Sequence, residues 1–169
     1  MGLPSKLKNF NVYLDGVSHL GEIAEVTLPK LTLAGEDYRG GGMLGPVFAD
    51  LGLDKMEAEF TAGGLIRGPL AQFGATRHDA AMLRFAGAYQ SDGTGRVQAL
   101  EAVLRGRYAE IDLGNAKAGS DTEHKFKMAV SYYRLIIGGI DVVEVDMLGA
   151  VFRVDGVDRY AEIRAAITG

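Results

Sequence analysis

The chain of 169 residues contains no cysteine. This absence excludes disulfide bonds, thiolate-bound metals and thiol catalysis, and it is compatible with a reducing compartment. Proline is also scarce, with 4 residues against 24 glycines. Abundant glycine without abundant proline is typical of a β-rich protein with many turns, and not of a low-complexity linker.

No apolar run approaches the roughly 20 residues that a membrane-spanning helix needs. Residues 1–8 lack the apolar core of a signal peptide, so we expect no stable membrane insertion. The formal net charge of -4 argues against a nucleic-acid grip, which requires clustered lysine and arginine. With 47% hydrophobic residues and a length suited to one core, the sequence predicts a single domain over residues 1–169.

Apolar and polar residues alternate with a period of two over most of the chain, which predicts strands. The alternation is regular at 55–61, and the longer runs at 97–112 and 125–137 predict two long strands. The faces expected to point inward are Met56, Ala58 and Phe60; Leu100, Ala102, Leu104 and Tyr108; and Phe126, Met128, Val130 and Tyr132. Gly138-Gly139 predicts a tight hairpin turn after the last of these strands.

Two segments predict helices, at 65–73 and at 157–168. Gly68-Pro69 interrupts the first segment, so we expect that helix to start near the proline and to end at Gly74. Asp158 is expected to cap the second helix.

These patterns predict a mainly β (α+β) protein, an antiparallel β-sandwich or barrel with one or two helices. Several predicted strands are polar along one whole face. In a lone sandwich such a face meets solvent, whereas long strands of this kind can also line a cavity or a channel. The pattern alone leaves both interpretations open.

The residue types that carry catalysis lack the spacing that catalysis requires. Gly40-Gly41-Gly42 is not followed by the Gly-Lys-Ser/Thr of a phosphate-binding loop. His19, His78 and His124 are too far apart in sequence for metal-ligand spacing, and Ser131 lacks the glycines of a nucleophile elbow. We therefore expect no catalytic residue, no metal site and no cofactor.

Arg105-Gly106-Arg107 is locally basic. Two arginines do not make a nucleic-acid groove, and an inter-subunit salt link is an equally good explanation of this motif.

Leu28-Pro29-Lys30-Leu31, followed by the run from Glu36 to Met43 (Glu-Asp-Tyr-Arg-Gly-Gly-Gly-Met), resembles the major tail tube protein of contractile-tailed bacteriophages. Further matches follow in the same order along nearly the whole chain, at 50–60, 104–112, 117–127, 130–133 and 154–159. No single motif is diagnostic, but the ordered set is specific. The chain is also similar to the tube protein of R-type contractile bacteriocins.

The resemblance implies a tail-tube-like fold in which the sheet of each subunit contributes to an oligomeric β-barrel channel. Hexameric rings would stack into the hollow inner tube of a contractile phage tail. That tube would conduct DNA without binding it specifically, and contraction of the sheath would drive it through the host envelope. The implied protein is structural and not an enzyme, belongs to the virion tail and assembles in the host bacterial cytoplasm.

The partners that the resemblance implies are other copies of the chain and the tail sheath, tape-measure, baseplate and tail terminator proteins. Within such a tube, we expect the N-terminal arm 1–8 and the loop 34–46 to touch neighbouring subunits. Glycine allows close backbone approach, and tyrosine and arginine are common interface anchors. The expected contact residues are Pro29, Lys30, Glu36, Tyr38, Arg39, Gly40, Gly41, Gly42, Met43, Arg105 and Arg107.

Other classes of protein make different predictions. A tube of an R-type bacteriocin or of a device like the type VI secretion system would share the same architecture. A small-molecule-binding β-barrel would be a closed monomer with an apolar pocket. A hydrolase on a β-sandwich would need a convergent polar triad, which we do not find in the sequence.

Overall fold

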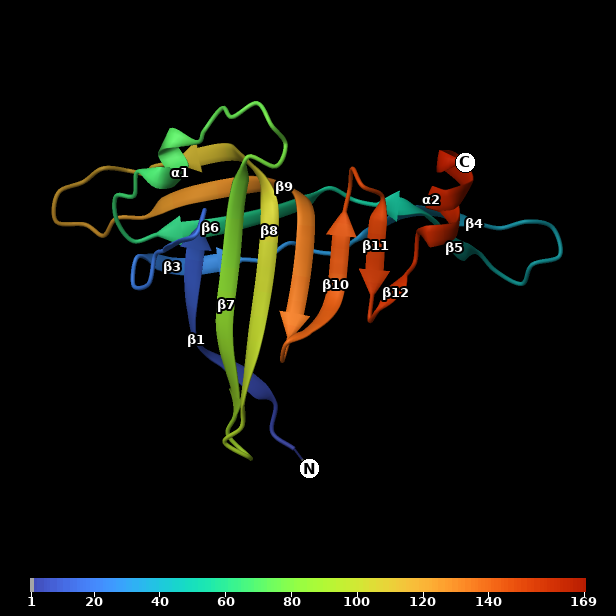
Figure 1. Ribbon diagram of the computed structural model, residues 1–169, viewed down its shortest axis with the longest axis horizontal. Coiled ribbons are helices and arrows are strands. Elements are labelled where there is room, and N and C mark those ends of the chain that lie inside the picture. The colour runs from blue at the N-terminus through green and yellow to red at the C-terminus, as the bar shows by residue number, and fades with distance from the viewer. Residues whose placement is uncertain (1) are drawn as a thin grey trace.

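The computed structural model describes residues 2–169, and its architecture is organised around one long antiparallel strand pair, β8 (Val97–Asp112) and β9 (His124–Ile137) (Figure 1). The strands that join this pair in one sheet are β1 (Ser5–Leu14), β2 (Val17–Ser18), β3 (Ile23–Thr27), β6 (Met56–Ala62), β7 (Ala81–Ser91), β10 (Ile140–Asp146), β11 (Val151–Val154) and β12 (Val157–Asp158). A separate hairpin is formed by β4 (Leu33–Tyr38) and β5 (Val47–Leu53), and the two helices are α1 (Gly68–Ala71) and α2 (Ala161–Thr168).

Strand β9 changes its partner at Ser131. Residues 124–130 pair with β6, whereas residues 132–137 pair with β10. The register between β8 and β9 shifts at the same point, because Arg105 lies opposite Tyr132 and Gly106 lies opposite Val130. Ser131 is therefore the extra residue of a β-bulge, a feature that bends a strand.

The bend divides the strands into two layers that share β8 and β9. The large sheet has the order β12-β11-β10-β9-β8-β7-β1-β2, and its strands run down the view in Figure 1. The four-stranded sheet consists of β3, β6, the first half of β9 and the second half of β8. The fold class is thus antiparallel and mainly β as predicted, but the sheet of a single chain does not close into a barrel.

The hydrophobic core lies on the inner side of the bend. Phe60 and Phe126 stack with ring centroids 4.9 Å apart, and Tyr108 meets each ring edge-on at 6.2 Å. The inward faces predicted at 55–61 and 97–112 are confirmed by the burial of their apolar residues. Burial of a large side chain such as Phe60 stabilises a fold by roughly 2–3 kcal/mol.

The prediction was wrong for Tyr132, which is partly exposed, while Tyr133 is only 3% exposed and belongs to the core. The bulge at Ser131 is the reason, because an extra residue moves every following side chain to the other face.

The turn prediction at Gly138-Gly139 is confirmed. These residues join β9 to β10 with φ of 59° and 81°. Positive φ at both positions is the type I′ conformation that favours a two-residue hairpin.

Both helices are shorter than predicted. Helix α1 spans only Gly68–Ala71 with Pro69 in its first turn, and Gln72 rather than Gly74 is its C-terminal cap. Residues 157–158 form the short strand β12, so α2 begins at Ala161 and the expected cap by Asp158 is absent. The Asp158 carboxylate instead accepts hydrogen bonds from the Tyr160 backbone N–H (3.1 Å) and from Arg164 Nη2 (2.6 Å).

The boundaries of two other predicted segments also differ. Residues 5–8 of the expected N-terminal arm belong to β1, and Met1 lies outside the described residues. The expected contact loop 34–46 is a strand up to Tyr38, so only 39–46 is a connection.

Candidate assembly interface

The outer face of the four-stranded sheet is polar from one edge to the other. Two rows of cross-strand neighbours run across this face: Thr27, Glu59, Lys127 and Glu110 in one, and Glu25, Thr61, Lys125 and Asp112 in the other. Glutamate and lysine lie directly opposite each other at Glu59–Lys127 and Lys127–Glu110, an arrangement that stabilises antiparallel pairing. Carboxylates outnumber cations in these rows, so the face has a net negative charge.

Both edges of this four-stranded sheet are unpaired in the part of the chain that the structure describes. Strand β3 pairs with β6 on one side only. The segment 107–112 of β8 pairs with β9 alone, because the pairing with β7 ends at Gly106. Unpaired strand edges present rows of free N–H and C=O groups, which another strand can bind.

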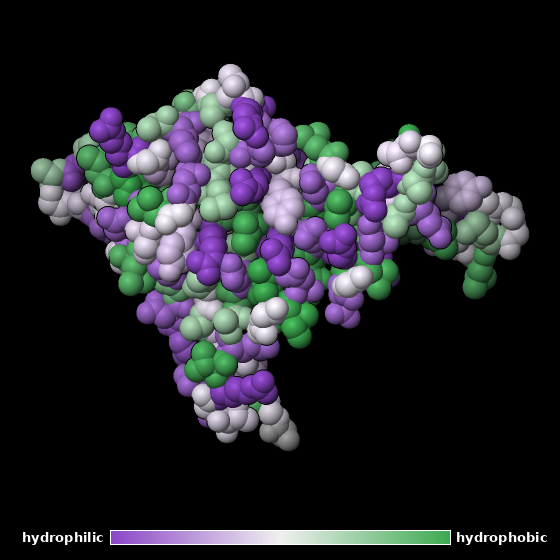
Figure 2. All heavy atoms as spheres, viewed as in Figure 1, coloured by the Kyte–Doolittle hydropathy of each residue, from purple (hydrophilic) through white to green (hydrophobic). Residues whose placement is uncertain are grey.

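The β4–β5 hairpin projects from the end of the molecule opposite α1 (Figure 1). Its strands pair from Leu33↔Leu53 to Tyr38↔Val47 and form a sheet of their own. Isolated two-stranded hairpins are marginally stable in water. The hairpin also leaves large side chains exposed to solvent. Their exposed fractions are 61% for Tyr38, 101% for Leu44, 54% for Val47, 55% for Phe48 and 69% for Leu51. Figure 2 shows part of this apolar surface at the tip of the projection.

The triple-glycine segment forms the turn at the end of this hairpin. The Gly40 N–H lies 3.0 Å from Met43 Sδ, and the Met43 N–H donates to the Gly40 carbonyl at 3.3 Å. Gly42 has a φ of 83°, a conformation that side-chain-bearing residues rarely adopt. A Cβ atom on Gly41 would meet no atom within 4 Å, so nothing within the subunit requires glycine there.

The predicted contact residues fall into two separate groups. Glu36, Tyr38 and Arg39 are exposed on the hairpin together with its glycine turn, while Arg105 and Arg107 are exposed on β8. The structure does not bring these two groups together. Arg107 Nη1 instead donates to the Thr76 carbonyl at 3.3 Å, beside the segment that follows α1.

Pro29 and Lys30 lie in the connection between β3 and the hairpin. Lys30 is exposed and lines a cleft of about 340 Å³ together with Lys55, Glu57 and Lys127. Pro29 is buried inside the subunit, so its side chain is not available at the surface of the monomer.

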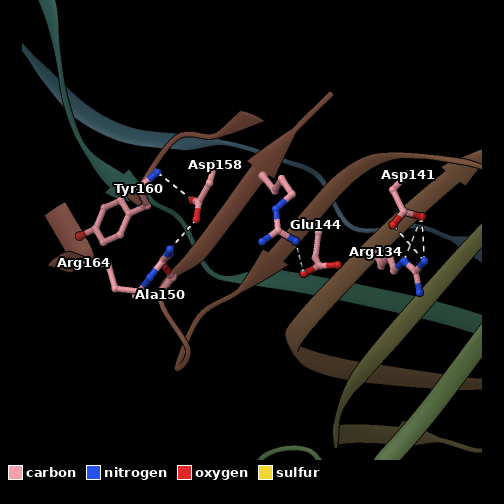
Figure 3. Close-up of polar contacts among 8 residues, drawn as sticks. Arg134, Asp141, Glu144, Ala150, Asp158, Tyr160 and Arg164 are labelled. Atoms are coloured by element: carbon pink, nitrogen blue, oxygen red, sulfur yellow. Dashed lines mark hydrogen bonds and ion pairs between the residues drawn. The ribbon is translucent and has the colours of Figure 1, made fainter. Parts of the chain in front are cut away.

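Ion pairs cross the outer face of the large sheet (Figure 3). Arg134 binds Asp141 at 2.8 Å, Arg153 binds Glu144 at 3.2 Å, and Arg164 binds Asp158 at 2.6 Å. The Arg164 guanidinium holds the pKa of Asp158 below its usual value. Arg134 and Asp141 are exposed, so their pair contributes little to stability, and nothing in the arrangement of the three pairs indicates catalysis.

The described residues contain no group of His, Cys, Asp and Glu side chains placed to hold a metal ion. None of the helices in 2–169 is long and apolar enough to cross a membrane. The unpaired edges and the projecting hairpin, rather than a chemical site, are thus the features that need an explanation.

Comparison with known proteins explains the unpaired edges and the projecting hairpin. The family model of phage tail tube protein FII matches residues 4–168. The chain belongs to this family. It is 45% identical over 170 residues to the tail tube protein of Escherichia phage P2, a match that covers 99% of each chain. It is 40% identical over 164 residues to the major tail tube protein of Serratia phage KSP20, covering 96% of this chain and 94% of that protein.

A solved structure shows the same fold. The chain matches a protein in the cryo-EM structure of the anti-feeding prophage baseplate, 6-fold symmetrised, with a TM-score of 0.51 and 14% identity, covering 80% of this chain and 97% of the other. The family likeness read from the sequence is therefore confirmed. This tail tube family member is a structural component of the virion tail, and it is not an enzyme. It self-assembles and associates with other tail components.

The sequence reasoning missed the apolar surface of the hairpin. Val47 and Phe48 follow the glycine turn directly, and both are more than half exposed. The signal was the pairing of two extended segments around that turn, which places Val47, Phe48 and Leu51 on a projecting hairpin where they remain exposed.

Proposed function

We propose that this chain forms hexameric rings that stack into the inner tube of a contractile phage tail. The observation that carries this proposal is the four-stranded sheet with a polar outer face and two unpaired edges, β3 and the segment 107–112 of β8. In the ring, the β3 edge of one subunit pairs with the β8 edge of the next.

Strand direction favours this closure. The order β3-β6-β9-β8 is antiparallel throughout, so β3 and β8 point in opposite directions. Rotation about a ring axis keeps the direction of each strand. The β3 strand of the next subunit therefore pairs with β8 in the antiparallel direction. We call this β3–β8 boundary between subunits the seam, and the antiparallel order of strands continues across it. The six-fold number follows the family likeness.

The polar outer face of the four-stranded sheet then lines the channel, and the core lies behind it. A water-filled lumen requires such a face, because apolar strands would instead need a packed interior. The excess of carboxylates over cations in the two rows repels phosphates, so DNA passes through without a stable contact. The sheath grips the outside of the tube, the tape-measure protein occupies it before ejection, and baseplate and terminator proteins bind its two ends.

The hairpin and its glycine turn reach the neighbouring ring. Head-to-tail contacts of this kind stack without closing, and each can be weak because every ring makes several at once. A bacteriocin tube would use the same contacts, and the high identity to two phage tube proteins favours the phage tail.

The absence of cysteine allows a direct test by disulfide cross-linking. Glu25→Cys on β3 is combined in turn with Arg107→Cys, Glu110→Cys and Asp112→Cys on the β8 edge. Disulfides form only when Cα atoms approach to about 4.4–6.8 Å, so a paired seam cross-links in at least one of these variants. Oxidised assemblies run on a non-reducing gel as a ladder that ends at six subunits.

Glu162→Cys on α2, combined with the same β8 cysteines, is the matched control and gives no ladder. If electron microscopy shows rings but none of the three variants cross-links, the proposed pairing of β3 with β8 of the next subunit is wrong.

A further inference from the structure

The β4–β5 hairpin and the segment around α1 lie at opposite ends of the four-stranded sheet (Figure 1). The hairpin follows the C-terminal end of β3, whereas α1 follows the C-terminal end of β6. Since β3 and β6 are antiparallel, with Ile23 opposite Ala62 and Thr27 opposite Glu59, these two ends are the two extremes of the sheet. A head-to-tail contact joins such opposite surfaces of identical subunits.

The hairpin has a net negative charge. It contains the carboxylates Glu36, Asp37 and Asp50 against the single cation Arg39. Within residues 2–169, neither Glu36 nor Asp37 forms an ion pair. Their exposed charges are therefore free to meet a partner.

At the opposite end, the segment 63–80 around α1 has a net positive charge, with Arg67 and Arg77 against the single carboxylate Asp79. Arg67 precedes α1, Arg77 follows it, and Arg107 binds the carbonyl of Thr76 in the same segment. Arg105 is adjacent, because Ser131 Oγ lies 3.4 Å from the carbonyl oxygens of both Arg105 and His78. We call Arg67, Arg77, Arg105 and Arg107 the α1 cationic patch.

In residues 2–169, one carboxylate forms an ion pair with this patch, because Asp79 binds Arg77 at 3.1 Å. Among the described residues, Arg67, Arg105 and Arg107 have no acidic partner within ion-pair distance.

Apolar side chains accompany both charged surfaces. Beside the patch, Leu65 is 79% exposed and Phe73 56% exposed. On the hairpin, Leu44 and Phe48 are similarly uncovered. An apolar centre with charges around it is the usual composition of a specific protein contact.

We infer that the acidic β4–β5 hairpin of each subunit docks on the α1 cationic patch of a subunit in the adjacent ring. Leu65 and Phe73 receive the apolar tip of the hairpin, and Glu36 and Asp37 meet the arginines. This inference rests on the proposed tube and adds the receptor surface and its charge. It also accounts for Leu65 and Phe73, which lie on either side of α1 and are exposed in the subunit.

Charge reversal on each side provides the test. Hairpin-reversed protein carries Glu36→Lys and Asp37→Lys, and patch-reversed protein carries Arg67→Glu and Arg105→Glu. Each alone places like charges together at every ring contact, which we expect to lower the pelletable tube mass at least ~10-fold. Circular dichroism and thermal melting check that both variants fold.

Mixing the two purified variants is the decisive step. A hairpin-reversed ring then meets a patch-reversed ring with opposite charges on both of its faces, so alternating rings assemble. Electron microscopy and sedimentation should show tubes in the mixture and none in either variant alone. Glu162→Lys and Arg96→Glu, which change exposed charges elsewhere, are the controls and assemble normally.

The outcomes separate this inference from the proposed function. Folded variants that each assemble normally, or a mixture that stays without tubes while the unaltered chain forms them, overturn the docking inference only. Failure of the unaltered chain to form rings or tubes, even with a preformed tube as seed, overturns the proposed tube itself.

Discussion

Gly106 of β8 lies so close to Ala129 of β9 that a Cβ atom on the glycine would overlap the alanine carbonyl oxygen. This contact stands beside the bulge at Ser131, where β9 leaves β6 for β10. The two strands can bend together there because one of them lacks a side chain at the point of closest approach.

Replacement of this glycine should therefore damage the bend. We expect Gly106→Ala to lower the free energy of unfolding by about 2–4 kcal/mol, since backbone atoms would have to move to admit the methyl group. Urea denaturation followed by circular dichroism measures the change. Gly64→Ala is a suitable control, because a Cβ there meets no atom within 4 Å, and an equal loss in both variants would contradict a special role for Gly106.

A second prediction concerns Tyr108, whose hydroxyl is buried without a hydrogen-bond partner in the described structure. Burial raises the pKa of Tyr108 well above its usual value. In the unfolded chain the tyrosine has a pKa near 10 and loses its proton above that pH. In the folded protein, Tyr108 still keeps its proton there. The free energy of unfolding is therefore unaffected by this group below about pH 10. Above that value it falls as the pH rises, by up to ~1.4 kcal/mol per pH unit.

Tyr108→Phe removes this pH dependence together with the unpaired hydroxyl. At pH 7 we expect the variant to be about 1 kcal/mol more stable, because an unsatisfied buried polar group is destabilising. Urea titrations at pH 7 and at pH 11 measure both effects, and the advantage of the variant should be larger at pH 11. A variant that is less stable at both values would show that the hydroxyl has a partner.

The third prediction addresses Arg164 of α2. Its guanidinium donates hydrogen bonds to the Asp158 carboxylate at 2.6 Å and to the Ala150 carbonyl at 2.9 Å, and these bonds hold α2 against the sheet. The ion pair lowers the pKa of Asp158, so its contribution is present above the usual pKa of aspartate and is lost as the pH falls through the lowered value. Arg164→Met should speed amide hydrogen exchange in 161–168 several-fold at pH 7. Exchange in β8 and β9 provides the internal reference and should stay unchanged.

The glycine turn yields a fourth prediction, which separates folding from assembly. Gly41 has open space around it in the subunit, so Gly41→Leu should melt at the same temperature as the unaltered protein. We expect the same variant to form few tubes, because the turn must fit closely against the next ring in the proposed contact. Sedimentation of assembled material measures the loss. Normal tubes from Gly41→Leu would remove this turn from the interface.

Much of the fold could be predicted because alternation reports burial directly. The inward faces at 55–61 and 97–112 are correct, since regular strands repeat every two residues. The error at Tyr132 arose where the bulge at Ser131 interrupts that repeat, and single-sequence alternation has no signal for one inserted residue. The hydrophobic stripe of 157–168 resembled a longer helix because β12 is only two residues long. The turn Asp155-Gly156, which joins β11 to β12, was the local signal that the chain continues as a strand there.

The candidate interface was harder to predict than the fold. Local composition marked the glycine turn and Arg105 as unusual, and both are exposed. The unpaired edges of β3 and of 107–112 are properties of pairing across the whole chain, so no short motif indicates them. Pro29 was expected at a contact because of its motif, but the chain folds over it.

The strand pair that passes from one sheet into the other also has a mechanical consequence. In the proposed tube, a load on the channel wall would reach the outer layer along the covalent backbones of β8 and β9, and not only across side-chain packing. Because both strands continue from one layer into the other, a force that slides the layers apart would have to stretch these two backbones. In the proposed tube, the channel wall and the layer behind it would thus be held together in every subunit by the same two strands.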